Sequence, residues 1–200
     1  KHCFRLSRQH GIFIVMEIEE MTIVTASHAP QTYDRVARLL HWLVVALIAA
    51  QFLIGWTMPD IGRDTQQAGL VAWHLSVGAA LIAAVVARIA WRLTHRAPPS
   101  TLSPALNAVS RATHFLLYVF LTLVPLLGWA NASSRGWHVT LLGAIDLPSL
   151  APTGSPTGHA MGDIHSALAW VLLVLIGAHV GAALFHRFVL KDNVMQRMMP

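Results

Sequence analysis

Four long stretches of apolar residues, separated by polar segments, dominate the pattern along the chain. They cover residues 39–58, about 68–87, 112–130 and 164 to about 186. A helix needs about 20 apolar residues to cross the hydrocarbon core of a bilayer, and each stretch reaches or approaches that length. Backbone polar groups in lipid must hydrogen bond within their own segment. The pattern therefore predicts an all-α membrane protein, a four-helix transmembrane bundle whose main solvent is lipid.

The segments outside these stretches differ in length and composition. Residues 59–67 form a short connection, residues 93–110 contain three prolines, and residues 131–163 form a long segment rich in glycine and proline. A connection as long as the last one is often functional. Residues 1–30 contain no long apolar core and no small-residue cleavage site, so they do not indicate a secretory signal. We therefore expect a tail, 1–30, and one transmembrane domain, 31–200.

Lysine and arginine residues are distributed unevenly about the four predicted spans. Twelve precede the first span, surround the second connection or follow the fourth span: Lys1, Arg5, Arg8, Arg35, Arg38, Arg88, Arg92, Arg96, Arg111, Arg187, Lys191 and Arg197. Only Arg63 and Arg135 remain for the opposite side. Cytoplasmic segments of membrane proteins carry the excess of positive charge, so we predict that both termini are cytoplasmic.

Composition supports a membrane protein and excludes a nucleic-acid-binding domain. Of the 200 residues, 55% are hydrophobic and only 12% are charged, whereas soluble domains carry about 25% charged residues. The mean hydropathy is +0.56. The formal net charge of +5 would suit a nucleic acid, but the basic residues flank the apolar spans, where they set topology.

Twelve histidines are many for a chain of 200 residues, and five lie within or at the margins of the predicted spans. Ionisable groups inside a membrane are costly, so each is a candidate functional residue. Span direction places His74 and His165 near the outer ends of their helices, and His41 and His179 near the inner ends. His165 and His179 are 14 residues apart, nearly four turns and about 21 Å along one helix face. The sequence thus predicts two histidine pairs at two depths.

Two pairs of imidazoles in a helix bundle suit two b-type haems, each with two axial histidines. Bundle interiors hold such sites, and two axial ligands leave no open iron position, which favours electron transfer. Structural zinc would need four ligands. The chain has one cysteine, Cys3, and no C-x-x-C-H motif, so the haems would be bound noncovalently.

Two further residues near the inner pair have open roles. Arg88 follows His74 by 14 residues and therefore lies on the same face, near the inner haem. It either pairs with a haem propionate or only sets topology. The fifth histidine, His114, has no evident partner, and either packing or a quinone contact explains it. A lone histidine near a helix end is more often an interfacial side chain than a ligand. The assignment of the two histidine pairs as ligands therefore depends on their matched depths.

Several motifs, in order, resemble those of the prokaryotic cytochrome b561 family. They are Tyr33-Asp34-Arg35, Leu40-His41-Trp42-Leu43, Trp73-His74 followed by Arg88 and Arg92, and the stretch from His179 through Lys191-Asp192-Asn193 to Met198-Met199-Pro200. The resemblance covers about residues 33–200. It implies a four-helix, dihaem cytochrome of the bacterial inner (plasma) membrane that exchanges electrons with quinone. Some relatives take electrons from superoxide.

The resemblance implies that His41, His74, His165 and His179 are the haem ligands, since they fall where the family places them. The residues before Tyr33 depart from the compact family start, which suggests an extended gene model. Residues 1–20 form no span, hold no assigned ligand and precede a plausible start at Met21, so we expect them to be dispensable.

The leading functional hypothesis is electron transfer from an outer-side donor, such as superoxide, through two haems to membrane quinone. Arg135 is the only lysine or arginine of the long outer segment and is the candidate residue for attracting an anionic donor. We assign no catalytic residue. Two alternatives stay open: a haem-bearing membrane anchor subunit of a larger dehydrogenase or hydrogenase, which would copurify with that enzyme, and a haemless transporter or scaffold, which would be colourless.

Overall fold

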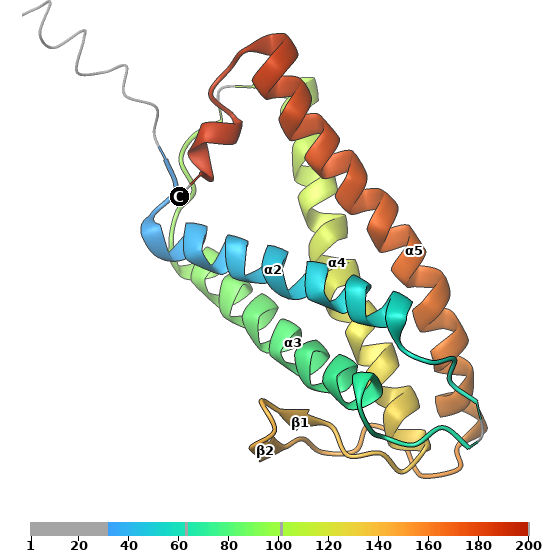
Figure 1. The fold of residues 1–200 in the computed structure, drawn as a ribbon. Coiled ribbons are helices and arrows are strands. Elements are labelled where there is room, and N and C mark those ends of the chain that lie inside the picture. Colours follow the sequence, from blue (N-terminus) through green and yellow to red (C-terminus); the bar gives the residue numbers. More distant parts are fainter. Residues whose placement is uncertain (1–31, 63, 101, 200) are drawn as a thin grey trace, which may run out of the picture. The chain divides into compact units, whose positions relative to one another are not determined.

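The computed structural model describes residues 32–62, 64–100 and 102–199. Within that part the chain forms four long helices: α2 (Arg35–Thr57), α3 (Leu70–Thr94), α4 (Pro104–Ser134) and α5 (Pro156–Phe185) (Figure 1). The shorter elements are β1 (Thr140–Leu141), β2 (Ile145–Asp146), a π-helix η1 (His186–Leu190) and a 3-10 helix η2 (Met195–Arg197). The predictions for residues 1–30 fall outside the described residues.

The four helices are long and apolar enough to cross a membrane, as the hydrophobic pattern predicts. Large apolar side chains point away from the bundle, and Leu39, Leu53 and Val174 are 71%, 62% and 70% exposed. Lipid tails are as apolar as leucine, so such side chains need no protein partner. The prediction of an all-helical protein with four long apolar helices is confirmed, and only the two-residue strands β1 and β2 add to it.

The helices α4 and α5 begin earlier than the apolar pattern indicates. Ser103 accepts a hydrogen bond from the Leu106 amide and Ser155 accepts one from the Gly158 amide, and a proline follows each serine. A serine cap followed by proline is a strong helix start. The expected connections 93–110 and 131–163 are therefore wrong in extent, because the helices leave only residues 95–103 and 135–155 between them.

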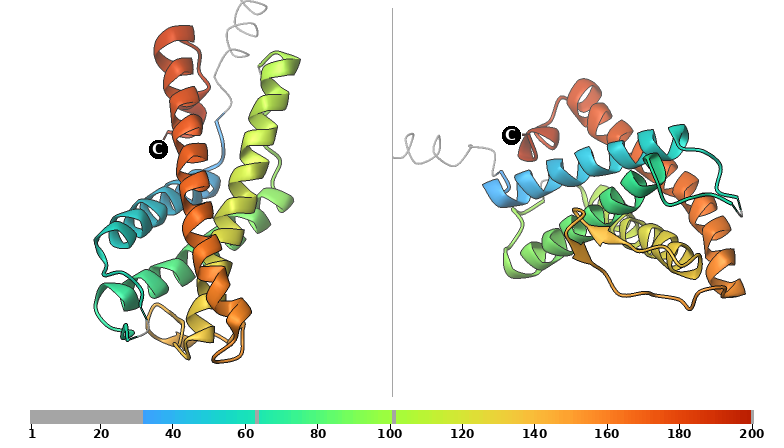
Figure 2. Two further views of the ribbon diagram at one scale, coloured as in Figure 1. Left: turned by 90° about the vertical axis from the view of Figure 1, so that its right-hand side faces the viewer. Right: turned by 60° about the horizontal axis from the view of Figure 1, so that its bottom comes forward.

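The helices pack in two antiparallel pairs, α2 along α3 and α4 along α5, and α3 and α4 join the pairs (Figures 1 and 2). Val44, Leu81, Val85, Leu121, Val124 and Leu172 form the main buried core. Small residues allow α4 and α5 to approach closely. A Cβ atom at Gly158 would lie 2.4 Å from the Ser134 Cβ, so only glycine fits there.

Two ends of the bundle can be defined by their connections. We call the end with residues 58–69 and 135–155 the loop side. The opposite end, with the start of α2, residues 95–103 and residues 186–199, is the terminal side.

The C-terminal segment returns to the start of α2 on the terminal side. Its backbone accepts three hydrogen bonds from the α2 region: Tyr33 N to Arg197 O at 3.1 Å, Arg38 Nη1 to Met199 O at 2.9 Å, and Trp42 Nε1 to Met198 O at 2.9 Å. These contacts place the closing motif beside the opening motif, although they are separated by most of the sequence.

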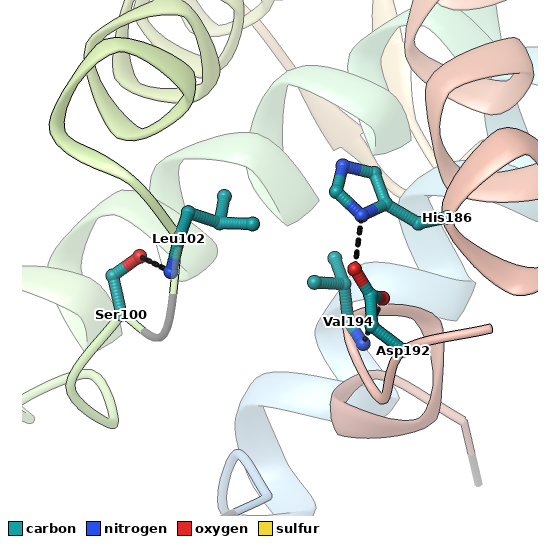
Figure 3. Close-up of polar contacts among 5 residues, drawn as sticks. All are labelled: Ser100, Leu102, His186, Asp192 and Val194. Carbon is teal, nitrogen blue, oxygen red and sulfur yellow. Dashed lines mark hydrogen bonds and ion pairs between the residues drawn. The ribbon is translucent and has the colours of Figure 1, made fainter. Parts of the chain in front are cut away.

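Polar side chains shape the turn that begins this segment (Figure 3). His186 Nδ1 lies 2.5 Å from Asp192 Oδ2, and the Val194 amide donates to Asp192 Oδ1 at 3.0 Å. Burial raises the pKa of the Asp192 carboxyl, but the bonds from His186 and Val194 outweigh it and hold that pKa below its ordinary value. The charged carboxylate of Asp192 therefore stabilises the turn through its bonds with His186 and Val194.

Asp34 caps α2 and joins it to the end of α3. The Ala37 amide donates to Asp34 Oδ1 at 2.9 Å, and the Trp91 indole donates to the same oxygen at 3.0 Å. The bond from Ala37 is the main cause of a lowered Asp34 pKa, because both donors stabilise the charged carboxylate.

Candidate functional site

The loop-side histidines meet between two helices. His74, one turn into α3, and His165 on α5 have ring centroids 6.1 Å apart and ring planes at 85°. Both rings line a cavity to which Gln51, Gly78 and Gly128 also contribute. The structure thus brings together the two residues that span direction predicts as the outer pair.

A backbone carbonyl orients the His165 ring. Nδ1 of His165 lies 2.8 Å from Val124 O, and since a carbonyl can only accept, Nδ1 carries the proton. Nε2 is then the unprotonated nitrogen, which is the form that binds a metal. Gly128 permits this arrangement, because a Cβ atom there would lie 2.9 Å from His165 Nδ1. Sequence reasoning missed both Val124 and Gly128, and the glycine inside an apolar span was the only available signal.

The His74 ring has a different environment. Its Nδ1 atom is buried and has no hydrogen-bond partner among the described residues. The ring packs against Gly55 of α2, where a Cβ atom would lie 3.5 Å from His74 Cε1 and 3.8 Å from Nδ1. The Nδ1 edge of His74 therefore faces α2.

Three histidines gather toward the terminal side. His179 of α5 and His114 of α4 have ring centroids 5.2 Å apart and ring planes at 81°. His114 Nδ1 donates to Ser110 O at 2.7 Å, which leaves its Nε2 as the unprotonated nitrogen. His41 lies near the start of α2, one turn after Ala37, whose carbonyl accepts a hydrogen bond from Arg88. His114, which the sequence left without a partner, is thus a neighbour of His179, and the pairing of His41 with His179 stays a prediction.

Arg88 lies at this level and already has protein partners. Its Nε donates to the Tyr118 hydroxyl at 3.2 Å and its Nη1 donates to Ala37 O at 3.1 Å. These bonds tie α3 to α4 and α2. They use two of the five N–H donors of a guanidinium, and the expected contact with a haem propionate stays a prediction.

The donor sets fit haem better than they fit a bare metal ion. Among the described residues no three histidine, cysteine or carboxylate side chains are arranged to hold a metal ion. A porphyrin supplies four ligands itself and asks the protein for one or two axial ligands, as facing histidines in a bundle provide. The close His74–His165 pair, with His165 oriented by a carbonyl, meets that requirement.

Arg135, the candidate for attracting an anion, is held by several contacts at the end of α4. Its Nε donates to Asn131 Oδ1 at 3.2 Å, its Nη1 donates to Gly62 O at 2.9 Å, and its guanidinium lies 5.4 Å from the Trp137 ring centroid. These contacts hold the positively charged guanidinium in one position on the loop side.

Known proteins share the pattern of this chain over most of its length. Residues 32–200 match the family described as prokaryotic cytochrome b561. Cytochrome b561 homolog 2 of Escherichia coli K12 is 30% identical over 178 residues, which cover 86% of this chain and 94% of that protein. Cytochrome b561 homolog 1 of the same organism is 31% identical, with 80% and 93% covered. A Yersinia pestis protein named probable superoxide oxidase CybB is 29% identical, with 80% and 92% covered.

Proposed function

Because the chain belongs to the prokaryotic cytochrome b561 family, we propose that this membrane cytochrome carries electrons across the bilayer through two noncovalently bound b-type haems. The family confirms the resemblance found in the sequence motifs and implies haem b as the cofactor. The number of haems and their ligands belong to the proposal.

The observation that carries the proposal is the placement of histidines at two levels of one bundle. On α5, His165 and His179 are 14 residues apart, or about 21 Å at 1.5 Å per residue. His165 meets His74 on the loop side. His179 lies beside His114 toward the terminal side, the end at which α2 begins and carries His41. Two haems at these levels would divide the crossing into two shorter electron transfers.

In this proposal His74 and His165 hold the loop-side haem, and His41 and His179 hold the terminal-side haem. Arg88 donates to the carbonyl of Ala37, one turn before His41, and has further donors suited to a propionate. The haem iron would supply one-electron redox chemistry, and ligation by two histidines would reserve it for electron transfer. Other residues of the chain would hold these histidines in position, as Val124 O does for His165.

Charge sets the proposed orientation. Of the lysine and arginine residues that the structure describes, Arg135 alone lies on the loop side, at the end of α4. The positive-inside rule then puts the terminal side in the cytoplasm. Electrons would enter on the loop side, from outside, and leave toward the cytoplasmic side.

The proposed donor is superoxide and the proposed acceptor is membrane quinone. The Yersinia pestis relative is named a probable superoxide oxidase, which supports the donor. Each superoxide gives up one electron and becomes molecular oxygen. A quinone takes two electrons and two protons to become the quinol, so two superoxide anions are consumed for each quinone reduced.

Haem content and ligand mutants test the proposal. A pyridine haemochrome assay of purified protein is expected to give two haem b per chain. His74→Ala and His165→Ala are expected to remove one redox component, and His41→Ala and His179→Ala the other. His138→Ala is the control, because among the described residues this exposed loop-side histidine makes hydrogen bonds through its backbone alone. One haem or none in the parent protein, or the same component lost in His74→Ala and His41→Ala, would refute the proposal.

A further inference from the structure

Two buried polar atoms without partners line the same cavity on the loop side. They are Oε1 of Gln51 and Nδ1 of His74, neither of which has a hydrogen-bond partner among the described residues. Both side chains line the cavity beside His165. Buried polar atoms are nearly always hydrogen bonded, so two unpaired atoms beside one cavity require an explanation.

The two atoms lie along one seam between α2 and α3. The Nδ1 edge of His74 faces α2 at Gly55. Gln51 is one turn before Gly55 and so shares its face of the helix. The Nε2 atom of Gln51 is 2.8 Å from where a Cβ atom of Gly78 would stand, and Gly78 is one turn after His74. The carboxamide and the imidazole thus occupy adjacent turns of the same contact.

Their chemistry is complementary. Oε1 of a glutamine can only accept a hydrogen bond, and Nδ1 of a histidine that binds a metal through Nε2 can only donate one. They do not bond directly. One buried water needs two or more polar partners, and it would stand at the Nδ1 edge of His74, which faces α2, away from the Nε2 atom that would bind the haem.

We propose that Gln51 is a positioning residue for His74: the Nδ1–H of His74 donates to one buried water, and that water donates to the carboxamide oxygen of Gln51. This inference rests on the proposed role of His74 as a haem ligand. It gives His74 the same support that Val124 O gives His165 at 2.8 Å. Each ring is then held in the tautomer whose unprotonated nitrogen is Nε2, the atom that would bind the haem.

The bridge has a measurable consequence for the haem. A histidine ligand whose second N–H donates to an acceptor is more basic, and loss of such support commonly costs ten- to a hundredfold in metal affinity. A more basic ligand stabilises ferric iron relative to ferrous iron. Gln51 therefore lowers the reduction potential of the loop-side haem and slows the dissociation of that haem.

Three variants test this assignment. Gln51→Leu removes the acceptor at similar size, Gln51→Glu keeps and strengthens it, and Leu53→Ala changes a 62% exposed residue of the same helix as a control. Redox titration and electron paramagnetic resonance of the purified protein report each haem separately, and transfer to an excess haem acceptor reports dissociation. The terminal-side haem is an internal control in every variant.

In Gln51→Leu we expect the ferrous-to-ferric ratio of one haem to rise about tenfold, a shift of about 59 mV for a one-electron couple. That haem is also expected to dissociate about tenfold faster, and it is the one that His74→Ala removes. Gln51→Glu is expected to shift the same haem in the opposite direction. If Gln51→Leu loses this haem altogether, its retention in Gln51→Glu supports the assignment and its loss in both overturns it.

Other outcomes overturn the inference while leaving the proposed function intact. They are an unchanged potential and spectrum in Gln51→Leu, equal shifts of both haems, or shifts of the same sign in Gln51→Leu and Gln51→Glu, which would indicate packing alone. The proposed function itself fails separately, if the parent protein lacks two haems or if His74→Ala keeps both.

Discussion

Gly128→Ala is the sharpest single test of how α4 positions His165. The added methyl group would stand 2.9 Å from His165 Nδ1 and 3.0 Å from Cε1, closer than carbon atoms pack. The ring must therefore move, and its 2.8 Å bond to Val124 O must lengthen or break. Nothing else at this position resists the change, because alanine is otherwise the better residue in a helix.

The magnitude follows from opposing contributions. Overpacking costs about 1–3 kcal/mol, and leaving the His165 N–H without its acceptor costs about 1–3 kcal/mol. Replacing glycine by alanine in a helix returns about 1 kcal/mol. The net free-energy cost to the conformation that holds His165 for the haem centres on about 3 kcal/mol. Since each 1.4 kcal/mol is a tenfold change in affinity, we expect the loop-side haem to bind about a hundredfold more weakly.

The assay is a comparison of Gly128→Ala with Gly55→Ala. A Cβ atom at Gly55 would lie 3.5 Å from His74 Cε1, an ordinary contact with the other ring of the same pair. Gly128→Ala is expected to lose one of two haems in a pyridine haemochrome assay and one component in a redox titration, whereas Gly55→Ala keeps both. Retention of both haems with an unchanged spectrum in Gly128→Ala would show that the close approach of α4 does not orient His165.

Three further predictions concern other parts of the chain. His114→Ala is expected to keep two haems and to change the spectrum of the terminal-side haem alone, because the His114 ring is 5.2 Å from that of His179. Loss of a haem in a pyridine haemochrome assay would instead make His114 a ligand. Arg135→Glu is expected to slow reduction by superoxide in stopped-flow measurements at low ionic strength and less so at high salt, with equal rates at low salt contradicting a steering role. Asp34→Ala is expected to lower the melting temperature at neutral pH, since it removes the α2 cap. The folded-state pKa of Asp34 is lowered, so the stabilisation is present above the unfolded-state pKa and disappears as pH falls through the folded-state value. A melting difference between Asp34→Ala and the parent that persists below that pH would contradict the charge argument.

Much of the fold can be predicted from the sequence because the bilayer simplifies the problem. Span number follows from length and hydropathy alone, since an apolar side chain such as Leu53 is as stable in lipid as in a core. Histidine depth follows from the constant rise of a helix, which is why His74 and His165 could be matched before any contact was known. The N-cap serines Ser103 and Ser155 were readable signals, but the apolar pattern cannot detect a polar first turn.

Only the tertiary structure decides which faces meet, because helix rotation depends on contacts between residues far apart in sequence. The bond from His165 to Val124 O joins residues 41 positions apart. Every residue has a backbone carbonyl, so the sequence does not indicate which one accepts this bond. The neighbour of His114 likewise depends on how α4 and α5 are turned toward each other. Sequence alone therefore determines the four spans and the levels of the histidines. The orientation of each ring, and the glycine contacts that allow it, arise from packing between helices.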